Sequence, residues 1–274
     1  MSLDPGRTGK VFADVRAAGR GALVGFLHVG YPDVPTSLRA VRALTGEDNS
    51  PGVDLVEVGM PYSDPMMDGV TIQRAGTRAL ERGVRTRDAF AAVEAVANAG
   101  TAAVVMTYWN LIERYGPDAF ARDLAAAGAT GMITPDLIPD EAQEWIAASD
   151  EHRIDRTFLV SPSSTDERLA MTVANCRGFV YATALMGVTG ARTSVSRQAP
   201  DLVARVRHAD REMPVGVGLG VGNGKQAAEV AAFADGVIVG SALIRCVLQA
   251  PDRATGLARL RALSAELADG VRQK

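Results

Sequence analysis

Residues 54–69 read Asp-Leu-Val-Glu-Val-Gly-Met-Pro-Tyr-Ser-Asp-Pro-Met-Met-Asp-Gly, and the prediction of the fold starts from these residues. Together with Val53 it begins as a short apolar run that has the length and the β-branched content of a buried strand. Glu57 interrupts this run just before the strand ends. The rest of the stretch is too rich in Gly, Pro, Ser and Asp to form a helix. We therefore predict a strand that leads into a loop carrying Asp64 and Asp68.

A carboxylate inside a buried strand is costly, because an unpaired buried charge loses its hydration without compensation. Glu57 therefore needs either a partner or a chemical function. Carboxylates at and just beyond the carboxyl end of a strand suit acid–base chemistry in the mouth of a barrel. On residue types alone a structural interpretation is equally good: Asp64 and Asp68 cap turns, and Glu57 pairs with an arginine. Both interpretations stay open at this point.

Outward from this stretch, the chain alternates between short β-rich runs and helical patterns. Eight such units at this length favour a closed (β/α)₈ TIM barrel of the α/β class over an open doubly wound sheet. No linker divides the chain, so we expect one domain over 1–274, with an N-terminal extension and short helix (1–20), the barrel (about 21–250) and a C-terminal helix (251–274). The expected strands are 23–27, 53–58, 102–107, 131–134, 156–160, 178–183, 214–218 and 235–239. The expected helices are 11–18, 35–44, 72–80, 87–99, 117–127, 140–148, 165–175, 200–209, 225–232, 242–249 and 253–271.

Composition limits the possible partners and the location. The net charge of −3 gives no indication of binding to nucleic acid or to an anionic membrane. No apolar run approaches the roughly 18 residues of a membrane span, and the N-terminus lacks a signal-peptide core, so we expect a cytoplasmic protein. Cys176 and Cys246 are isolated in the sequence, which argues against a disulfide framework and against a thiolate metal site.

Glycine-rich turns follow the last three expected strands, at 187–190, 218–224 and 240–241. In barrels, the loops after the seventh and eighth strands commonly hold a phosphate through backbone N–H groups and the N-terminus of a short helix. Glycine lets the backbone approach the anion closely. Ser241, at the expected helix start, could add a hydroxyl. We therefore predict a phosphate-bearing ligand.

The remaining residues exclude several other chemistries. The only lysines are Lys10, Lys225 and Lys274, and none suits a Schiff-base aldolase, which needs a buried lysine. The histidines are far apart in sequence and only His28 ends a strand, where packing is slightly favoured over a role in the mouth, so no metal site is expected. No dinucleotide fingerprint is convincing. What remains is proton transfer on a phosphorylated substrate by Glu57 and Asp68.

Segment 57–69 resembles the signature of the tryptophan synthase alpha subunit family. The likeness runs from about Leu23 through nearly the whole chain, and the arginine-rich composition resembles that of high-GC bacteria such as actinomycetes. The joint match is more specific than any single motif. Further segments that resemble the family, in its order, are 106–110 (Met-Thr-Tyr-Trp-Asn), 135–137 (Pro-Asp-Leu), 187–191 (Gly-Val-Thr-Gly-Ala), 218–220 (Gly-Leu-Gly) and 240–241 (Gly-Ser).

The resemblance implies a barrel that cleaves indole-3-glycerol phosphate to indole and glyceraldehyde 3-phosphate in a retro-aldol reaction. It implies that Glu57 is the acid–base residue and that Asp68 binds the indole N–H. It also implies a beta subunit as partner in an α₂β₂ complex, with pyridoxal phosphate on that subunit and no cofactor on this chain. The implied substrate contacts are Phe26, Tyr108, Tyr181, Thr189 and Leu219, with Met106, Ile133 and Val160 in the same apolar slot. The implied phosphate contacts are Gly190, Gly220, Gly240 and Ser241.

The chain departs from the usual family pattern at Gly25, His28, Val70 and Ile138, and the last two lie where a beta subunit would dock. These departures leave open a stand-alone lyase of a specialised indole pathway. A separate alternative is a non-catalytic activator of a beta subunit, and the presence of both Glu57 and Asp68 argues against it. A third alternative, indole-glycerol-phosphate synthase, normally uses a catalytic lysine on a barrel strand, and the scarcity of lysine speaks against it.

Overall fold

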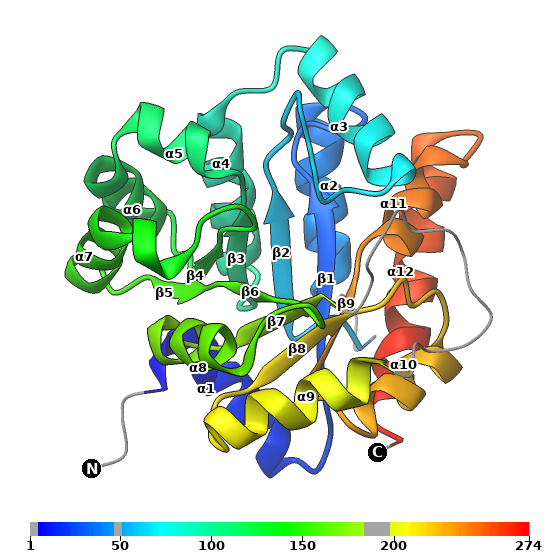
Figure 1. The fold of residues 1–274 in the computed structure, drawn as a ribbon. Helices are drawn as coiled ribbons and strands as arrows, with labels where there is room; N and C mark the ends of the chain where they lie inside the picture. The colour runs from blue at the N-terminus through cyan, green and yellow to red at the C-terminus, as the bar shows by residue number, and fades with distance from the viewer. Residues whose placement is uncertain (1–4, 47–50, 184–197, 274) are drawn as a thin grey trace.

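The computed structural model describes residues 5–46, 51–183 and 198–273. Its core is a parallel sheet whose strands follow one another around a ring, in the order β5-β4-β3-β2-β1-β9-β8-β7-β6 (Figure 1). The strands are β1 (Ala22–His28), β2 (Leu55–Gly59), β3 (Ala102–Met106), β4 (Gly131–Ile133), β5 (Asp155–Thr157), β6 (Leu159–Val160), β7 (Val180–Thr183), β8 (Val215–Gly218) and β9 (Gly236–Val239).

The ring closes through the chain itself at Phe158. This single residue separates β5, which pairs with β4, from β6, which pairs with β7. The two short strands are thus the halves of the one strand expected over 156–160. If β5 and β6 are counted as one strand, the sheet has the eight strands of the expected (β/α)₈ barrel. That prediction is confirmed.

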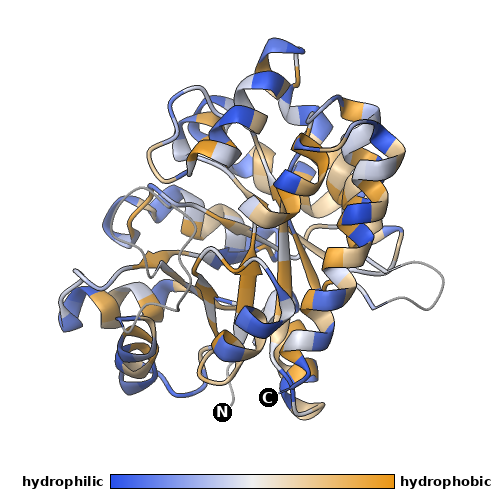
Figure 2. Ribbon diagram, turned by 90° about the vertical axis from the view of Figure 1, so that its right-hand side faces the viewer, coloured by the Kyte–Doolittle hydropathy of each residue, from blue (hydrophilic) through white to orange (hydrophobic). Residues whose placement is uncertain are grey.

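Helices surround the barrel and turn their polar faces outward, while the strands form an apolar centre (Figure 2). Several begin at a side chain that accepts a backbone N–H, as Asp33 does for Thr36 and Thr165 does for Arg168. The helices are α1 (Gly6–Ala17), α2 (Val34–Leu44), α3 (Val70–Glu81), α4 (Thr86–Ala97), α5 (Trp109–Tyr115), α6 (Pro117–Ala126), α7 (Gln143–Glu151), α8 (Asp166–Asn175), α9 (Gln198–Ala209), α10 (Gly224–Ala231), α11 (Ser241–Leu248) and α12 (Arg253–Val271), with a 3₁₀ turn, η1 (Pro139–Glu141).

Three helical segments differ from the expectation. Helix α1 begins at Gly6, five residues before the start expected at residue 11. The helix expected over 140–148 is the 3₁₀ turn η1 followed by α7, because the chain restarts its helical geometry at Ala142. Helix α5 was not predicted. It has only seven residues, and the acceptor for its first N–H is the Asp136 carboxylate, 27 residues further along the chain, at 2.9 Å from the Trp109 nitrogen. Trp109 packs edge-on against Trp145 of α7, with ring centroids 6.4 Å apart.

The inside of the barrel is filled in layers, because every second residue of a strand points inward. The layer nearest the amino-terminal ends of the strands is covered by helix α1. Phe12 of α1 stacks on Phe179 with ring centroids 5.0 Å apart. Helix α1 therefore plugs the amino-terminal end of the barrel. The layer's buried apolar side chains form one cluster, which consists of Phe12, Val15, Ala22, Val24, Leu55, Val104, Ile133, Phe179 and Ile238.

A buried ion pair fastens this plug. The Asp155 carboxylate, whose residue is 1% exposed, accepts the backbone N–H of Thr8 at 2.6 Å and the Nε–H of Arg177 at 2.9 Å. It thereby satisfies a free N–H in the first turn of α1 with a negative charge, which the helix dipole favours. Burial raises the pKa of Asp155, and its hydrogen bonds oppose that shift.

We expect Asp155→Ala to lower the free energy of unfolding by about 3 kcal/mol, because it leaves Thr8 and Arg177 without their buried acceptor. Urea denaturation followed by circular dichroism measures this. The matched control is Asp14→Ala, which removes an exposed partner of Lys10 on the same helix and should cost well under about 1 kcal/mol. Equal effects of the two substitutions would show that the buried pair does not fasten the plug.

Candidate active site

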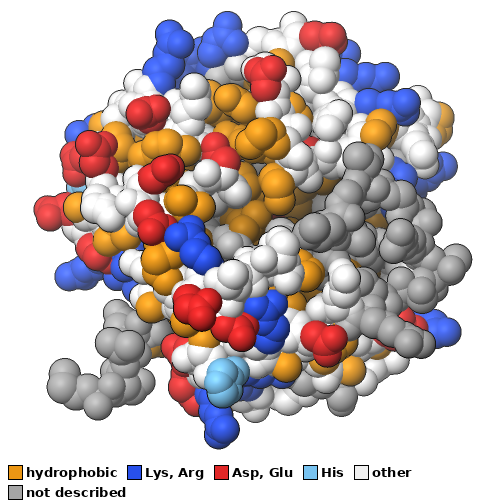
Figure 3. All heavy atoms as spheres, viewed as in Figure 1, with side chains coloured by type: hydrophobic (Ala, Val, Ile, Leu, Met, Phe, Trp, Pro, Cys, Tyr) orange, Lys and Arg blue, Asp and Glu red, His pale blue; other side chains and the backbone are white. Residues whose placement is uncertain are grey.

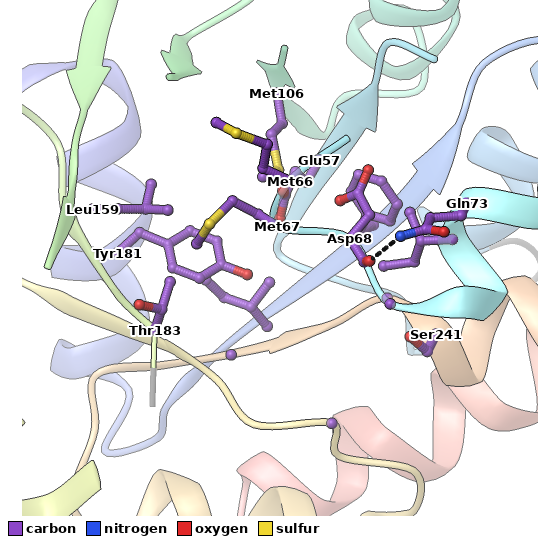
Figure 4. A pocket seen from close by; sticks show the side chains of 17 residues that line it. Glu57, Met66, Met67, Asp68, Gln73, Met106, Leu159, Tyr181, Thr183 and Ser241 are labelled. Atoms are coloured by element: carbon purple, nitrogen blue, oxygen red, sulfur yellow. Dashed lines mark hydrogen bonds between the residues drawn. The ribbon is translucent and has the colours of Figure 1, made fainter. Parts of the chain in front are cut away.

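The catalytic candidates form the next layer up, at the carboxyl ends of the strands. In β2 and β7 the residue two positions beyond the apolar layer is polar: Glu57 follows Leu55, and Tyr181 follows Phe179. A cavity of about 400 Å³ opens here, within the usual range for small-molecule sites. On the outer surface, hydrophobic side chains gather around a hollow in the upper half of this face (Figure 3). The lining residues are Phe26, Glu57, Met66, Met67, Asp68, Gly69, Ile72, Gln73, Met106, Leu159, Tyr181, Thr183, Gly218, Gly220, Ile238, Gly240 and Ser241 (Figure 4).

Glu57 is 1% exposed, and its Oε2 atom has no hydrogen-bond partner within the described ranges. Nor does any ion pair of the described residues involve it, so the arginine partner considered from the sequence is absent there. Burial, and to a smaller degree the Asp68 charge, raises the pKa of Glu57 from 4.5 to about 8. At neutral pH the side chain is therefore mostly a protonated acid facing the cavity, a state suited to proton donation.

Asp68 lies in the loop between β2 and α3, and its side chain points into the same cavity (Figure 4). Gln73, in the first turn of α3, donates a hydrogen bond from Nε2 to the Asp68 carbonyl at 2.8 Å. Burial raises the pKa of Asp68 from 3.8 to about 6. The two carboxyl groups therefore differ at neutral pH, with Asp68 mostly ionised and Glu57 mostly protonated. Asp64 is exposed, accepts a hydrogen bond from the side-chain hydroxyl of Ser63 and is not among the residues that line the cavity.

Tyr181 points toward the two carboxyl groups from β7 (Figure 4). Burial raises its pKa well above 10, and the charges of Glu57 and Asp68 raise it further, so the phenol stays protonated. A Cβ on Gly218 of the neighbouring β8 would lie 2.7 Å from the Tyr181 hydroxyl oxygen. Glycine at 218 is thus the residue that leaves room for the tyrosine.

The opposite side of the cavity is made of backbone. Gly220 has φ +71°, a conformation that favours glycine, and Gly240 and Ser241 form the N-terminus of α11. Together these residues present N–H groups and the positive end of a helix dipole. No lysine or arginine of the described segments lines the cavity, so an anion here would be held by backbone dipoles.

The apolar wall beside Glu57 is formed by Phe26, whose neighbour in register across the sheet is Glu57 itself. Its ring lies over Gly59, where a Cβ would come within 2.4 Å of it. Behind Phe26 lies His28, 5% exposed, with ring centroids 5.1 Å apart and Nδ1 3.3 Å from the Gly59 carbonyl oxygen. Burial lowers the pKa of His28 to about 4, so the ring is neutral and packs behind the wall, as the sequence slightly favoured.

The implied site residues fall into three groups. Glu57, Asp68, Phe26, Met106, Tyr181, Gly220, Gly240 and Ser241 all line the cavity. Tyr108, Leu219, Ile133 and Val160 are not among its lining residues: Ile133 and Val160 belong to the core, Leu219 packs against it, and Tyr108 is 4% exposed. Thr189 and Gly190 lie outside the described residues.

Seven cavity residues were not predicted as site residues from the sequence: Leu159, Thr183 and Ile238 on strands, and Met66, Met67, Ile72 and Gln73 in the loop and in α3. The inward alternation from Tyr181 would have found Thr183, two positions further along β7. No such signal exists for the loop residues, because an irregular loop has no period.

Among the described residues, no helix has both the length and the continuous apolar character of a membrane span. Within the same ranges, His, Cys, Asp and Glu side chains nowhere gather in groups of three that could hold a metal ion.

The chain is similar to known proteins over nearly its full length. Residues 12–272 match the family model described as "Tryptophan synthase alpha chain". The alpha chain of Mycobacterium marinum is 62% identical over 268 residues, which cover 98% of this chain and 96% of the relative. The alpha chain of Mycobacterium tuberculosis is 62% identical over 266 residues, covering 97% and 94%.

Solved structures agree. A chain of tryptophan synthase from Mycobacterium tuberculosis superimposes with a TM-score of 0.91 and 60% identity, covering 98% of this chain and 99% of that one. A mutant alpha subunit from Pyrococcus furiosus gives a TM-score of 0.81 at 33% identity, covering 90% and 98%. With a family model and relatives that span almost all of both chains, the resemblance seen in the motifs is confirmed: this chain belongs to the tryptophan synthase alpha chain family.

Proposed function

We propose that Glu57 and Asp68 carry out the alpha-chain reaction here, the retro-aldol cleavage of indole-3-glycerol phosphate to indole and glyceraldehyde 3-phosphate. The observation that carries this assignment is the buried carboxyl group of Glu57, whose Oε2 atom has no hydrogen-bond partner among the described residues, beside a mostly ionised Asp68 and opposite the N-terminus of α11. A buried acid without a partner costs stability, and a catalytic function accounts for it.

The substrate lies with its indole ring between Phe26 and the apolar side chains near Tyr181, and with its phosphate at Gly220, Gly240 and Ser241. Thr189 and Gly190 join the substrate and phosphate contacts, as the family resemblance implies. Asp68 accepts the indole N–H and stabilises the positive charge that develops on the ring.

Glu57 first donates its proton to indole C3. It then takes the proton of the glycerol 3′-hydroxyl as the carbon–carbon bond breaks, and the pair of electrons in that bond stays with the ring. One proton leaves Glu57 and one returns, so the residue ends the cycle as it began. A pKa near the working pH is what such a two-way transfer needs.

The partner in this proposal is a beta subunit, as the family resemblance implies. Large hydrophobic side chains stand exposed around the mouth, with Met66 78%, Met67 50%, Val70 50% and Ile138 41% exposed. Exposed apolar groups gathered near one opening are typical of a docking face. The cysteines of the described chain are free, which fits the cytoplasmic location that we propose.

The test is indole release from indole-3-glycerol phosphate by the purified chain, alone and with a beta subunit added. Slow release that the partner accelerates strongly is the expected result. The similarity to alpha chains does not support the stand-alone lyase or the non-catalytic activator, and the assay separates them: a lyase would be fast and indifferent to the partner, whereas an activator would release no indole at all.

We expect Ser241→Asp to raise KM for indole-3-glycerol phosphate at least about tenfold with a smaller change in kcat, because a carboxylate at the start of α11 repels the phosphate. The fold should tolerate the change, since an acidic residue at a helix start is favourable. Steady-state indole release measures both constants. The control Ala254→Asp adds the same charge at the exposed start of α12 and should leave KM unchanged; a similar rise in the control would remove Ser241 from the phosphate site.

A further inference from the structure

Tyr108 is a buried tyrosine whose hydroxyl is not in the cavity. It lies just before α5, is 4% exposed, and its hydroxyl oxygen accepts the backbone N–H of Met67 at 3.0 Å. The tyrosine therefore contacts the chain at the residue before Asp68, from behind the cavity wall.

Tyr108 is itself held on two sides. Its ring stacks on that of Tyr62, with centroids 4.7 Å apart and planes inclined by 20°. The next residue, Trp109, donates its N–H to the Asp136 carboxylate at 2.9 Å. These contacts tie the loops after β2, β3 and β4 together, so the hydroxyl has a fixed place against which another segment can be positioned.

The segment that it contacts has few other anchors. Met66 and Met67 are largely exposed, and glycine and proline interrupt the loop. The two hydrogen bonds that bracket Asp68 are the one from the Met67 N–H to Tyr108, on its amino side, and the one from Gln73 to the Asp68 carbonyl, on its carboxyl side. Without the first of these, the backbone before Asp68 would turn more freely.

We propose that Tyr108 is a positioning residue: its hydroxyl fixes the backbone of Met67 and thereby aims the Asp68 carboxylate into the cavity. This inference rests on the proposed function, in which Asp68 accepts the indole N–H. It replaces the substrate contact that the family resemblance implied for Tyr108 with an action through the neighbouring loop. Because small errors in the placement of a reacting group cost rate steeply, the hydroxyl should matter for turnover although it does not touch the substrate.

The hydroxyl can do this over the whole working range of pH. Burial raises the pKa of Tyr108 to about 12, and the nearby carboxylates of Asp68 and Asp136 contribute to the rise. The phenol is therefore neutral wherever Asp68 is ionised, and its oxygen remains a constant acceptor for the Met67 N–H.

The experiment compares Tyr108→Phe, which removes only the hydroxyl, with Tyr62→Phe, which removes the hydroxyl from its stacking partner. The Tyr62 hydroxyl makes no hydrogen bond to any residue in the ranges that the structure covers, so it is a matched control. Two quantities are measured on the full chain, with and without a beta subunit. One is hydrogen exchange of the amides in peptides spanning 60–72, and the other is kcat and KM for indole-3-glycerol phosphate.

We expect Tyr108→Phe to speed exchange at the Met67 amide and to lower kcat about tenfold with KM changed less than about twofold. Tyr62→Phe should match the wild type in both measurements. Faster exchange with unchanged kcat would overturn the inference, as would a loss of kcat shared equally by the control. Failure of the proposed function looks different: the wild type itself would release no indole, while the exchange data would still decide whether the hydroxyl holds the loop.

Discussion

Indole release by the Glu57→Gln variant should fall at least about a thousandfold below the wild type, in the range that a single general acid–base group contributes. Glutamine keeps the shape of the side chain but can neither donate a proton to indole C3 nor accept one from the glycerol hydroxyl. The site should still bind, so KM should change much less than kcat. Single-turnover indole release with enzyme in excess measures the chemical step directly.

The same variant should be more stable than the wild type at high pH. Since the pKa of Glu57 is about 8 in the folded state against an ordinary 4.5, the folded protein binds more protons than the unfolded chain between these values. The wild-type free energy of unfolding therefore falls as pH rises from about 4.5 through 8, whereas the neutral glutamine lacks this penalty.

Urea unfolding at pH 5 and pH 8.5 tests this coupling. The gain from Glu57→Gln should be near zero at the lower pH and clear at the higher one. Glu94→Gln, an exposed substitution on α4, controls for loss of a surface charge and should show no such difference. A variant that lost activity without any gain at pH 8.5 would mean that Glu57 is not held as a buried acid, and a variant that kept its activity would end the catalytic assignment.

The pH dependence of kcat/KM should be bell-shaped, with an acidic limb near pH 6 and an alkaline limb near pH 8. Activity requires Asp68 ionised, which is lost below its pKa of about 6, and Glu57 protonated, which is lost above its pKa of about 8. Because the two carboxyl groups interact, the limbs belong to the pair.

Asp68→Asn assigns the limbs. We expect the rate to fall about a hundredfold, because the charge that develops on the indole loses its counter-charge. In the residual activity the acidic limb should vanish, and the alkaline limb should move to lower pH, since the negative charge of Asp68 contributes to the raised pKa of Glu57. Asp64→Asn, on the same loop but exposed, should keep both limbs in the chain assayed alone. An alkaline limb that stays in place would show that the carboxyl groups do not interact.

The barrel could be predicted from local sequence because its strands are short apolar runs that need no distant partner to be recognised. Glu57 could also be detected from local sequence, because it is a charged residue at a position where the strand pattern predicts an apolar one. The limits appear where the structure depends on distant contacts. Helix α5 takes its first acceptor from Asp136, and the strand over 156–160 is divided by pairing with two different neighbours, neither of which leaves a local pattern.

The site could be predicted only in part. The strand residues Phe26 and Tyr181 line the cavity as the family resemblance implied, whereas the strand residues Leu159, Thr183 and Ile238 were missed. The position of a side chain on a loop could not be predicted, because it depends on which backbone group the loop meets. Tyr108 is an example: the motif around it was recognised, but the Met67 N–H that its hydroxyl contacts is 41 residues away in the chain.

The edge-on packing of Trp109 against Trp145 has an optical consequence. These are the only two tryptophans of the chain, so its tryptophan emission comes from a single place, between α5 and α7. That place adjoins the Asp136 contact and is remote from the α1 plug at the other end of the barrel. Tryptophan fluorescence therefore reports only on the mouth side of the barrel. A change in emission that precedes the loss of circular dichroism during unfolding would show that the mouth opens before the barrel unfolds.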